Sequence, residues 1–280
     1  MPYIKRKQLA GMGVHYKFCT LEQMLDAQAA AGYQTIELLG IAPQFLLDER
    51  GYEDPVRIRR MAEDRGLHIG CFTPECACYQ YLMCAPENGV FHEKSMEYFK
   101  RGLEAASRLG AEKLLTNCIG GAWDEEYEAV YDRAVRSLSQ LGKIAEGYGI
   151  TIAVETVRPE ESKVIIKLPE LVRLLKDVDS PNVKGGLDTT AMGVANETPR
   201  EWFEALGDDL VHMHFIDGRP YKHLVWGDGL YPLADYLQIL NDYHYEGLLT
   251  QEITDFRYYD DAELADKRTV DAFRPYFIEE

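Results

Sequence analysis

The chain repeats one pattern along its length. A charged stretch with helical periodicity ends near a glycine, and a short apolar or β-branched run follows and closes on a polar residue. Gly32, Gly66, Gly110 and Gly149 lie where a helix needs a left-handed residue after its last turn. The runs after them are about 5 to 7 residues long and mostly do not alternate, which is typical of parallel strands buried on both faces. The junctions read AAAGYQTIELLG, EDRGLHIGCFTPE, SRLGAEKLLTNC, GYGITIAVET, SPNVKGGLD, LGDDLVHMHFID and YEGLLTQEIT.

This repetition predicts an α/β fold, a single (β/α)8 TIM barrel in one domain over residues 1–280. With LAGMGVHY as the first strand, the chain has eight strands, each followed by helical sequence, at an average period of about 35 residues. Thr20 and Gln23 are spaced as a capping box for the first helix. An open doubly wound sheet would need a phosphate-binding glycine fingerprint after the first strand, which LAGMGVHY followed by KFCT lacks. We expect helices over 20–31, 93–109, 125–147, 169–177 and 199–206.

Charge and composition exclude several classes of partner. The net charge of −17 disfavours binding to nucleic-acid phosphates and to anionic membranes. No apolar run approaches the roughly 18 residues of a membrane helix, and the start MPYIKRKQLAGMG lacks the apolar region of a secretory signal. The six cysteines do not suggest a disulfide scaffold, and Cys71, Cys76, Cys78 and Cys84 contain no Cys-x-x-Cys pair that would favour a zinc or iron–sulfur cluster. We therefore expect a reduced, cytoplasmic protein.

The chemistry of a (β/α)8 barrel lies at the C-terminal ends of its strands. A single polar residue there is usually solvated or caps the next helix. Glu155 in TIAVET and Glu252 in LLTQEIT, however, interrupt apolar runs, and a buried ionised carboxylate needs a partner. The residues that close the eight predicted strands are His15, Glu37, Glu75, Asn117, Glu155, Asp188, His214 and Glu252.

A shared divalent cation would resolve the cost of burying these acids. We predict that Glu155, Asp188, His214 and Glu252 bind one metal ion. Three carboxylates and one imidazole suit Mn²⁺ first, then Mg²⁺, Co²⁺ or Zn²⁺. We expect no organic cofactor. His212 lies two residues before His214 on the same side of its strand, one layer deeper, where a supporting role is favoured over direct ligation.

Several segments resemble a known family. VETVRPEES, GLDTTAMGV, HMHFIDG and TQEIT are similar to the metal-site segments of the sugar-phosphate isomerase/epimerase superfamily, the xylose-isomerase-like TIM barrels. The resemblance covers nearly the whole chain and keeps the strand order. It implies a divalent metal, a small ketose-like sugar as substrate, Glu155 and Glu252 as acid–base residues, and a homo-oligomer, dimer or tetramer. Within the superfamily, the fructoselysine 3-epimerases are most similar, through FTPECACYQY, PEESKV, LVHMHFID, the Gly227–Asp228–Gly229 turn and YEGLLTQEIT.

Two positions bear on the branch of the family. Many ketose 3-epimerases carry a histidine three residues after the metal aspartate, where this chain has Ala191. The fructoselysine branch also lacks that histidine, so Ala191 indicates that branch. The epimerases further carry an arginine soon after the metal histidine, and Arg219 is the candidate for it.

The resemblance implies proton transfer at C3 of a ketose or fructosamine through an enediolate, with one glutamate on each face of the intermediate. Aldose–ketose isomerisation at the same site is one alternative. An inosose-dehydratase-like lyase is another, with Glu75 or His15 as the acid. An endonuclease-IV-like nuclease uses a trinuclear zinc site with many more histidine ligands, and the seven histidines and net charge of −17 of this chain argue against it. A barrel that only binds a partner would be expected to lack a ligand, and all four are present.

Weaker signals mark substrate contacts. Arg158 is a candidate for an anionic group or for pairing with a neighbouring glutamate, and Asp217 for orienting a hydroxyl. Tyr79, Tyr81 and Trp123 follow strands on the same side and could cover a sugar. The predicted substrate-binding residues are Glu37, Glu75, Arg158, His212, Asp217, Arg219 and Trp226.

Overall fold

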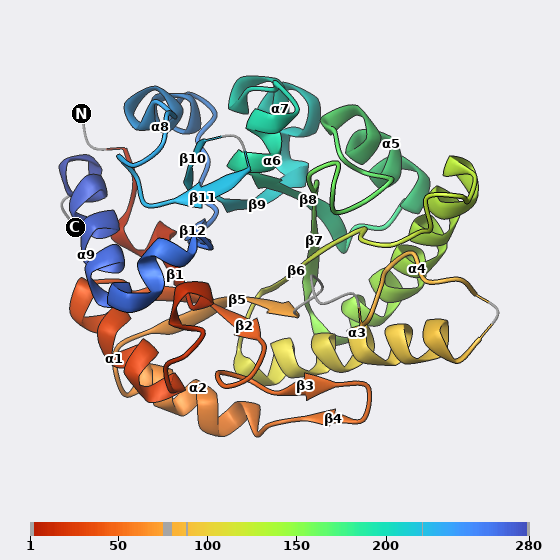
Figure 1. Cartoon of the computed structure of the whole chain (residues 1–280), viewed down its shortest axis with the longest axis horizontal. Coiled ribbons are helices and arrows are strands. Elements are labelled where there is room, and N and C mark those ends of the chain that lie inside the picture. Colours follow the sequence, from red (N-terminus) through yellow and green to blue (C-terminus); the bar gives the residue numbers. More distant parts are fainter. Residues whose placement is uncertain (1–2, 75–79, 88, 220, 279–280) are drawn as a thin grey trace.

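A computed structural model describes residues 3–74, 80–87, 89–219 and 221–278. Within them, eight parallel strands close into a barrel (Figure 1), which confirms the predicted (β/α)8 fold. Each strand pairs with the next barrel strand along the chain, and the last pairs with the first. The barrel strands are β1 (Leu9–Met12), β2 (Thr35–Gly40), β5 (His68–Pro74), β6 (Lys113–Asn117), β7 (Thr151–Glu155), β8 (Val183–Asp188), β9 (Leu210–His214) and β12 (Leu249–Gln251).

Helices surround the barrel (Figure 1) and bury one face against it. Thr20 caps the first helix by accepting a hydrogen bond from the Gln23 backbone N–H at 3.2 Å, one of the two bonds of a capping box. Gly110 and Gly149, with φ of 83° and 68°, end the two long helices in the left-handed conformation, as their spacing predicted. The helices are α1 (Leu21–Ala31), α2 (Pro55–Glu63), α3 (Val90–Leu109), α4 (Tyr127–Tyr148), α5 (Leu168–Val178), α6 (Thr189–Val194), α7 (Pro199–Leu206), α8 (Leu233–Asp242) and α9 (Ala262–Phe273).

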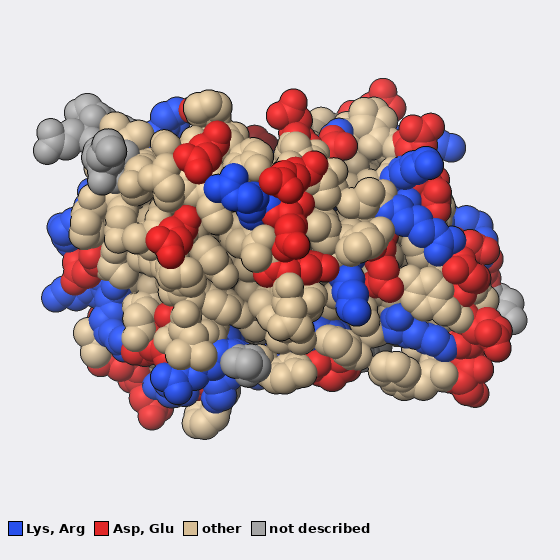
Figure 2. Space-filling view, turned by 90° about the horizontal axis from the view of Figure 1, so that it is seen from above, with Lys and Arg blue, Asp and Glu red and all other residues tan. Residues whose placement is uncertain are grey.

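Most of the buried apolar residues form one continuous core that joins the barrel strands to the helices around them. Every residue of β2 is buried, and so is every residue of β8 except the half-buried Lys184. This burial on both faces explains why the two sequences do not alternate between apolar and polar residues. Large side chains such as Trp202, Phe72 and Phe99 fill the layer between strands and helices. No helix within the described ranges is long and apolar enough to cross a membrane. On the face shown in Figure 2, lysines and arginines lie among aspartates and glutamates rather than in one basic patch.

Short elements inserted in the loops differ from the prediction. Antiparallel hairpins form from β3 (Leu47–Asp48) with β4 (Gly51–Tyr52) and from β10 (Asp217–Arg219) with β11 (Lys222–Leu224). The predicted first strand also stops at Met12 and is followed by a 3-10 turn at Val14–Tyr16. The β10–β11 hairpin matters for function, since it lies between the ends of β8 and β12 and carries a side chain into the site.

Candidate metal centre and active site

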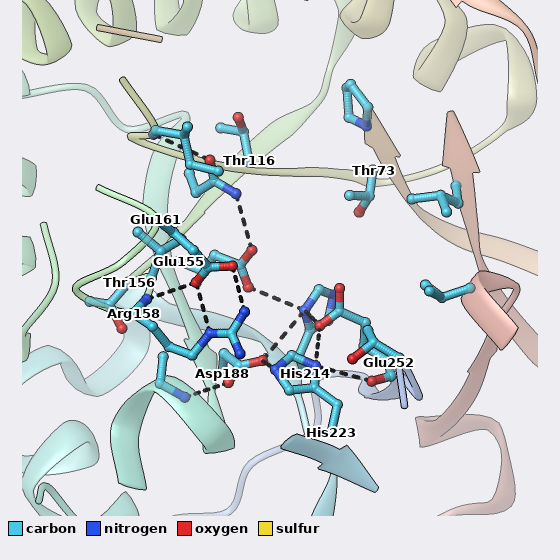
Figure 3. A pocket seen from close by; sticks show the side chains of 18 residues that line it. Thr73, Thr116, Glu155, Thr156, Arg158, Glu161, Asp188, His214, His223 and Glu252 are labelled. Atoms are coloured by element: carbon cyan, nitrogen blue, oxygen red, sulfur yellow. Dashed lines mark hydrogen bonds and ion pairs between the residues drawn. The ribbon is translucent and has the colours of Figure 1, made fainter. Parts of the chain in front are cut away.

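A cavity of about 260 Å³ opens at the C-terminal ends of the barrel strands (Figure 3). Its wall includes the four predicted metal ligands, although they are spread over nearly 100 positions of the chain. Glu155, Asp188 and His214 are the last residues of β7, β8 and β9, and Glu252 directly follows β12. Parallel strands end on the same side of a barrel, so these side chains converge there.

The convergence is centred on His214. Its Nδ1 lies 3.2 Å from Glu155 Oε2 and 3.3 Å from Glu252 Oε2. The same nitrogen lies 3.9 Å from Asp188 Oδ2. It is buried and has no hydrogen-bond partner within the described part of the chain. A buried ring nitrogen that is left unbonded beside three carboxylate oxygens fits a divalent cation, since such an ion uses the nitrogen lone pair and offsets the clustered negative charge.

Glu37 fixes the orientation of His214 from below the cavity. Its Oε1 lies 3.0 Å from His214 Nε2, and its Oε2 lies 2.7 Å from His212 Nε2. Thr73 Oγ1 donates a further hydrogen bond to Oε1. Because a carboxylate accepts, His214 Nε2 carries a proton, which leaves Nδ1 as the ring nitrogen that can offer a lone pair to a cation. Glu37 and His212 do not line the cavity, so this geometry supports a role in holding His214 and not their predicted contact with substrate.

Charge and burial shift the pKa values of the cluster in opposite directions. Burial raises the pKa of Glu155 to about 7, and burial also raises the pKa of Asp188. For Glu252, the nearby imidazoles of His214 and His223 outweigh burial and lower its pKa. The pKa of His214 lies well above its usual value, because the surrounding carboxylates outweigh burial. Without a cation, protons therefore supply the positive charge that the cluster needs, and a metal ion would displace them.

His223 is a fifth polar side chain of this cluster, and the sequence-based prediction missed it. It lies on β11, lines the cavity and is 8% exposed. Its Nδ1 is 2.8 Å from Glu252 Oε2, and its Nε2 is 3.8 Å from Asp188 Oδ2. The signal that could have located it is the turn composition of DGRPY between two short apolar segments, which is typical of a hairpin loop.

Arg158 lines the cavity beside the cluster (Figure 3), but its guanidinium is already paired. Its Nε and Nη2 donate to the two carboxylate oxygens of Glu161 at 2.9 and 2.7 Å, and Nη1 donates to the Tyr221 carbonyl. Two roles were predicted for Arg158: binding an anionic group of the substrate, or pairing with a neighbouring glutamate. The contact with Glu161 corresponds to the second. Asn117 Nδ2 donates to Glu155 Oε1 at 3.4 Å.

Comparison with known proteins bears on the family of the chain. The family model described as Xylose isomerase-like TIM barrel matches residues 25–276. The chain belongs to this family. Fructoselysine 3-epimerase of Escherichia coli O157:H7 is 26% identical over 262 residues, which cover 93% of this chain and 94% of that protein. D-psicose 3-epimerase of Enterocloster bolteae is 25% identical over 267 residues, covering 90% of this chain and 85% of the relative.

Solved structures of sugar epimerases share the fold. A crystal structure of D-psicose 3-epimerase in the presence of D-fructose aligns with a TM-score of 0.79 at 20% identity, covering 96% of this chain and 98% of the other. The apo form of 3-keto-D-glucoside 4-epimerase from E. coli aligns with a TM-score of 0.77 at 14% identity, covering 96% and 99%. The family match confirms the resemblance seen in the sequence, and the relatives, which are sugar epimerases, confirm the prediction of an enzyme.

Three predicted substrate contacts of this family member lie outside the cavity wall. Trp226 is buried and donates its indole N–H to the Phe215 carbonyl, so it belongs to the core. Arg219 is exposed and donates to the Asp228 carbonyl. Asp217 is buried. Its carboxylate is stabilised there by hydrogen bonds of 2.7–3.0 Å that it accepts from the backbone N–H groups of Gly218, Gly227, Gly229 and Tyr231.

Three other residues that the sequence singled out, His15, Tyr81 and Trp123, do not line the active-site cavity. His15 is buried with Nε2 3.1 Å from Asp266 Oδ1 on α9, away from the cavity wall. Tyr81 is buried and hydrogen-bonded to Glu49, and Trp123 lies on a neighbouring cavity. Glu75, Tyr79, Cys76 and Cys78 lie outside the described residues. Cys71 and Cys84 are buried free thiols.

Proposed function

We propose that this chain is a divalent-metal-dependent sugar epimerase that inverts C3 of a ketose or fructosamine through an enediolate. The observation that carries the proposal is the meeting of Glu155, Asp188 and Glu252 around the unbonded Nδ1 of His214. Relatives with about a quarter of their residues identical and covering most of the chain are named as 3-epimerases of ketose sugars.

The metal site would use Glu155, Asp188, His214 and Glu252, with Mn²⁺ as the first choice. When bound, such an ion acts as a Lewis acid, which makes the proton next to a sugar carbonyl more acidic and stabilises the negative charge that develops. His214 is held for this role by Glu37, and the backbone N–H of Ala191 donates to Asp188 Oδ1 at 2.6 Å, which orients that carboxylate.

Glu155 and Glu252 would act as the acid–base pair. They reach the cavity from β7 and from the end of β12, two strands that are not neighbours in the barrel. A sugar between them would therefore meet one carboxylate on each face. One glutamate takes the C3 proton from its face, and the other returns a proton from the opposite face, which inverts the configuration. The roles exchange when the reverse reaction runs.

A second cavity favours a substrate that carries a substituent. It has a volume of about 600 Å³ and shares Glu161 with the first cavity. Its wall combines the exposed Trp123 with the acidic Asp124, Glu125 and Glu160. Glu125 is paired with Arg133, and Glu160 and Glu161 are paired with Arg158, so a cationic group attached to the sugar would be attracted chiefly to the carboxylate of Asp124. The fructoselysine 3-epimerase relative makes fructosamines the first compounds to test.

The decisive experiment is hydrogen exchange in D₂O. The metal-loaded protein is incubated with ketoses, ketose phosphates and fructosamines, and NMR locates the incorporated deuterium. Deuterium at C3 together with the C3 epimer supports the proposal. Label at C1 or C2 indicates the aldose–ketose isomerase, and loss of water indicates the lyase.

Two variants make this test specific. Glu155→Gln removes one acid–base carboxylate and should abolish exchange at C3. Glu160→Gln changes a half-exposed carboxylate of the second cavity and should leave exchange with an unsubstituted ketose within about twofold of the wild type. Exchange that persists in Glu155→Gln would contradict the assignment of the base.

A further inference from the structure

His223 reaches the active-site cavity from the β10–β11 hairpin rather than from a barrel strand. It pairs with Gly218 across the hairpin, and its ring lines the cavity beside Asp188 and Glu252 (Figure 3). It is not one of the four metal ligands proposed above. The two ring nitrogens have different surroundings, and these surroundings indicate what the residue does.

The Nδ1 atom holds Glu252. It lies 2.8 Å from the carboxylate oxygen Oε2 and 3.2 Å from the backbone carbonyl of the same residue. Both neighbours are acceptors, so Nδ1 carries a proton and donates it. This contact ties the side chain of an acid–base residue to a hairpin outside the barrel, which restricts the directions in which its carboxylate can point.

The Nε2 atom is left for a ligand. It lies 3.8 Å from Asp188 Oδ2, which is too far for a hydrogen bond. None of the described residues forms a hydrogen bond with this nitrogen. In either protonation state it can bind a sugar oxygen: as N–H it donates to the oxygen, and as a lone pair it accepts from a hydroxyl. Ala191, which also lines the cavity, contributes only a methyl group to the wall.

The hairpin that carries His223 is anchored on both sides of it. Asp217 pairs with Leu224 across the hairpin, and its buried carboxylate accepts hydrogen bonds from backbone N–H groups, as described above. The neighbouring Lys222 donates to the buried Asp255 at 2.6 Å. The ring is therefore held in place before a ligand arrives, which reduces the entropy lost on binding.

We propose that His223 binds an oxygen of the sugar through Nε2 and positions Glu252 through Nδ1. This inference rests on the proposed function, since it assigns a role at the same site. Two substitutions separate its two halves. In His223→Asn the amide nitrogen can replace Nδ1 but cannot reach the position of Nε2, whereas in His223→Gln the longer amide reaches towards Nε2 and loses the contact at Nδ1.

The expected results differ between the variants. His223→Asn should raise KM and weaken ketose binding about tenfold, which corresponds to the loss of one hydrogen bond, with a smaller change in kcat. His223→Gln should lower kcat about tenfold or more with a smaller change in KM, because Glu252 loses its hold. Mn²⁺ affinity of the apoprotein, measured by calorimetry, should stay within about threefold in His223→Asn, which keeps the contact with Glu252. It should fall by up to about tenfold in His223→Gln, which loses that contact, and His214→Asn should lose it altogether.

The matched control is His68→Asn. His68 also pairs with a carboxylate, with Nε2 2.9 Å from Glu112 Oε1, but it begins β5 at the opposite end of the barrel. It should leave KM, kcat and Mn²⁺ affinity unchanged.

Three outcomes would contradict part of this reasoning, and they are distinguishable. Absence of hydrogen exchange by the wild type with any ketose contradicts the proposed function. Equal ketose binding by the wild type and His223→Asn, measured by calorimetry on the metal-loaded proteins, contradicts the role of Nε2 whether or not exchange occurs. A loss of Mn²⁺ affinity above tenfold in both His223 variants would make this residue a metal ligand and overturn the proposal.

Discussion

Glu37 offers the sharpest test of how the metal centre is built, because it contacts the metal ligand His214 but does not itself line the cavity. Its carboxylate is buried and lies 3.0 Å from His214 Nε2 and 2.7 Å from His212 Nε2. The two imidazoles outweigh burial and hold the pKa of Glu37 well below its usual value, so it acts as an acceptor towards both rings. We predict that Glu37→Gln weakens metal binding although the substituted residue is not a ligand.

The magnitude follows from counting donors and acceptors. A glutamine has one acceptor oxygen and one donor nitrogen, so it cannot accept from both rings. If its nitrogen faces His214, that ring must move its proton to Nδ1 and can no longer bind a cation. If it faces His212, the proton moves to the Nδ1 of that ring, which is buried without a partner among the described residues. Changes of this kind typically cost 10–100-fold in metal affinity, or about 1.4–2.7 kcal/mol.

The assay is a calorimetric titration of the metal-free protein with Mn²⁺. Glu112→Gln is the matched control, because Glu112 also pairs with a histidine, His68, at 2.9 Å, but at the other end of the barrel and with exposed side chains. It should change the Mn²⁺ affinity by less than about twofold. Glu37→Gln that binds Mn²⁺ as tightly as the wild type would refute the argument that Glu37 sets the tautomer of His214.

Three further predictions concern the same site and its support. Asp188→Asn should weaken Mn²⁺ binding more than Glu37→Gln does, with an unchanged far-ultraviolet circular dichroism spectrum; a weaker effect would place Asp188 outside the metal shell. Mn²⁺ affinity should rise between about pH 6 and 8, because burial raises the pKa of Glu155 to about 7 and the proton must leave before the carboxylate binds a cation; titration in buffers of different ionisation enthalpy should detect the released protons, and no release would contradict this linkage. Asp217→Ala should lower the free energy of unfolding in EDTA by about 2–4 kcal/mol, since four backbone N–H groups lose a charged acceptor; urea denaturation that matches the wild type would show that water replaces the carboxylate.

Most of the fold could be predicted from the sequence, because its local signals for helix ends and strands agree with one another. Glycines such as Gly110 and Gly149 mark helix ends, and the apolar runs after them are strands in the structure. The short hairpins escaped prediction for a physical reason: strands of two or three residues, such as β10 and β11, have too few positions to show a period.

Loops set the limit for predicting the site. Asp217, Arg219 and Trp226 follow β9 on the active-site side of the barrel, yet none of their side chains lines the cavity. Asp217 binds backbone N–H groups of its own loop, Arg219 lies at the surface, and Trp226 packs in the core. Sequence position indicates the end of the barrel at which a residue lies, but the direction of its side chain depends on contacts made by distant residues. The same limit concealed His223, whereas the absence of a histidine at Ala191 was visible in the sequence.

The amino-acid sequence by itself determined the barrel and the strand ends where Glu155, Asp188, His214 and Glu252 lie, because periodicity, glycine positions and buried acids are local features. Only the tertiary structure decided the rest of the centre. It showed that Nδ1 of His214 faces the carboxylates, because Glu37 from β2 binds the other ring nitrogen, and that a hairpin brings His223 to Glu252. These contacts join segments up to 177 positions apart, and no local pattern records them.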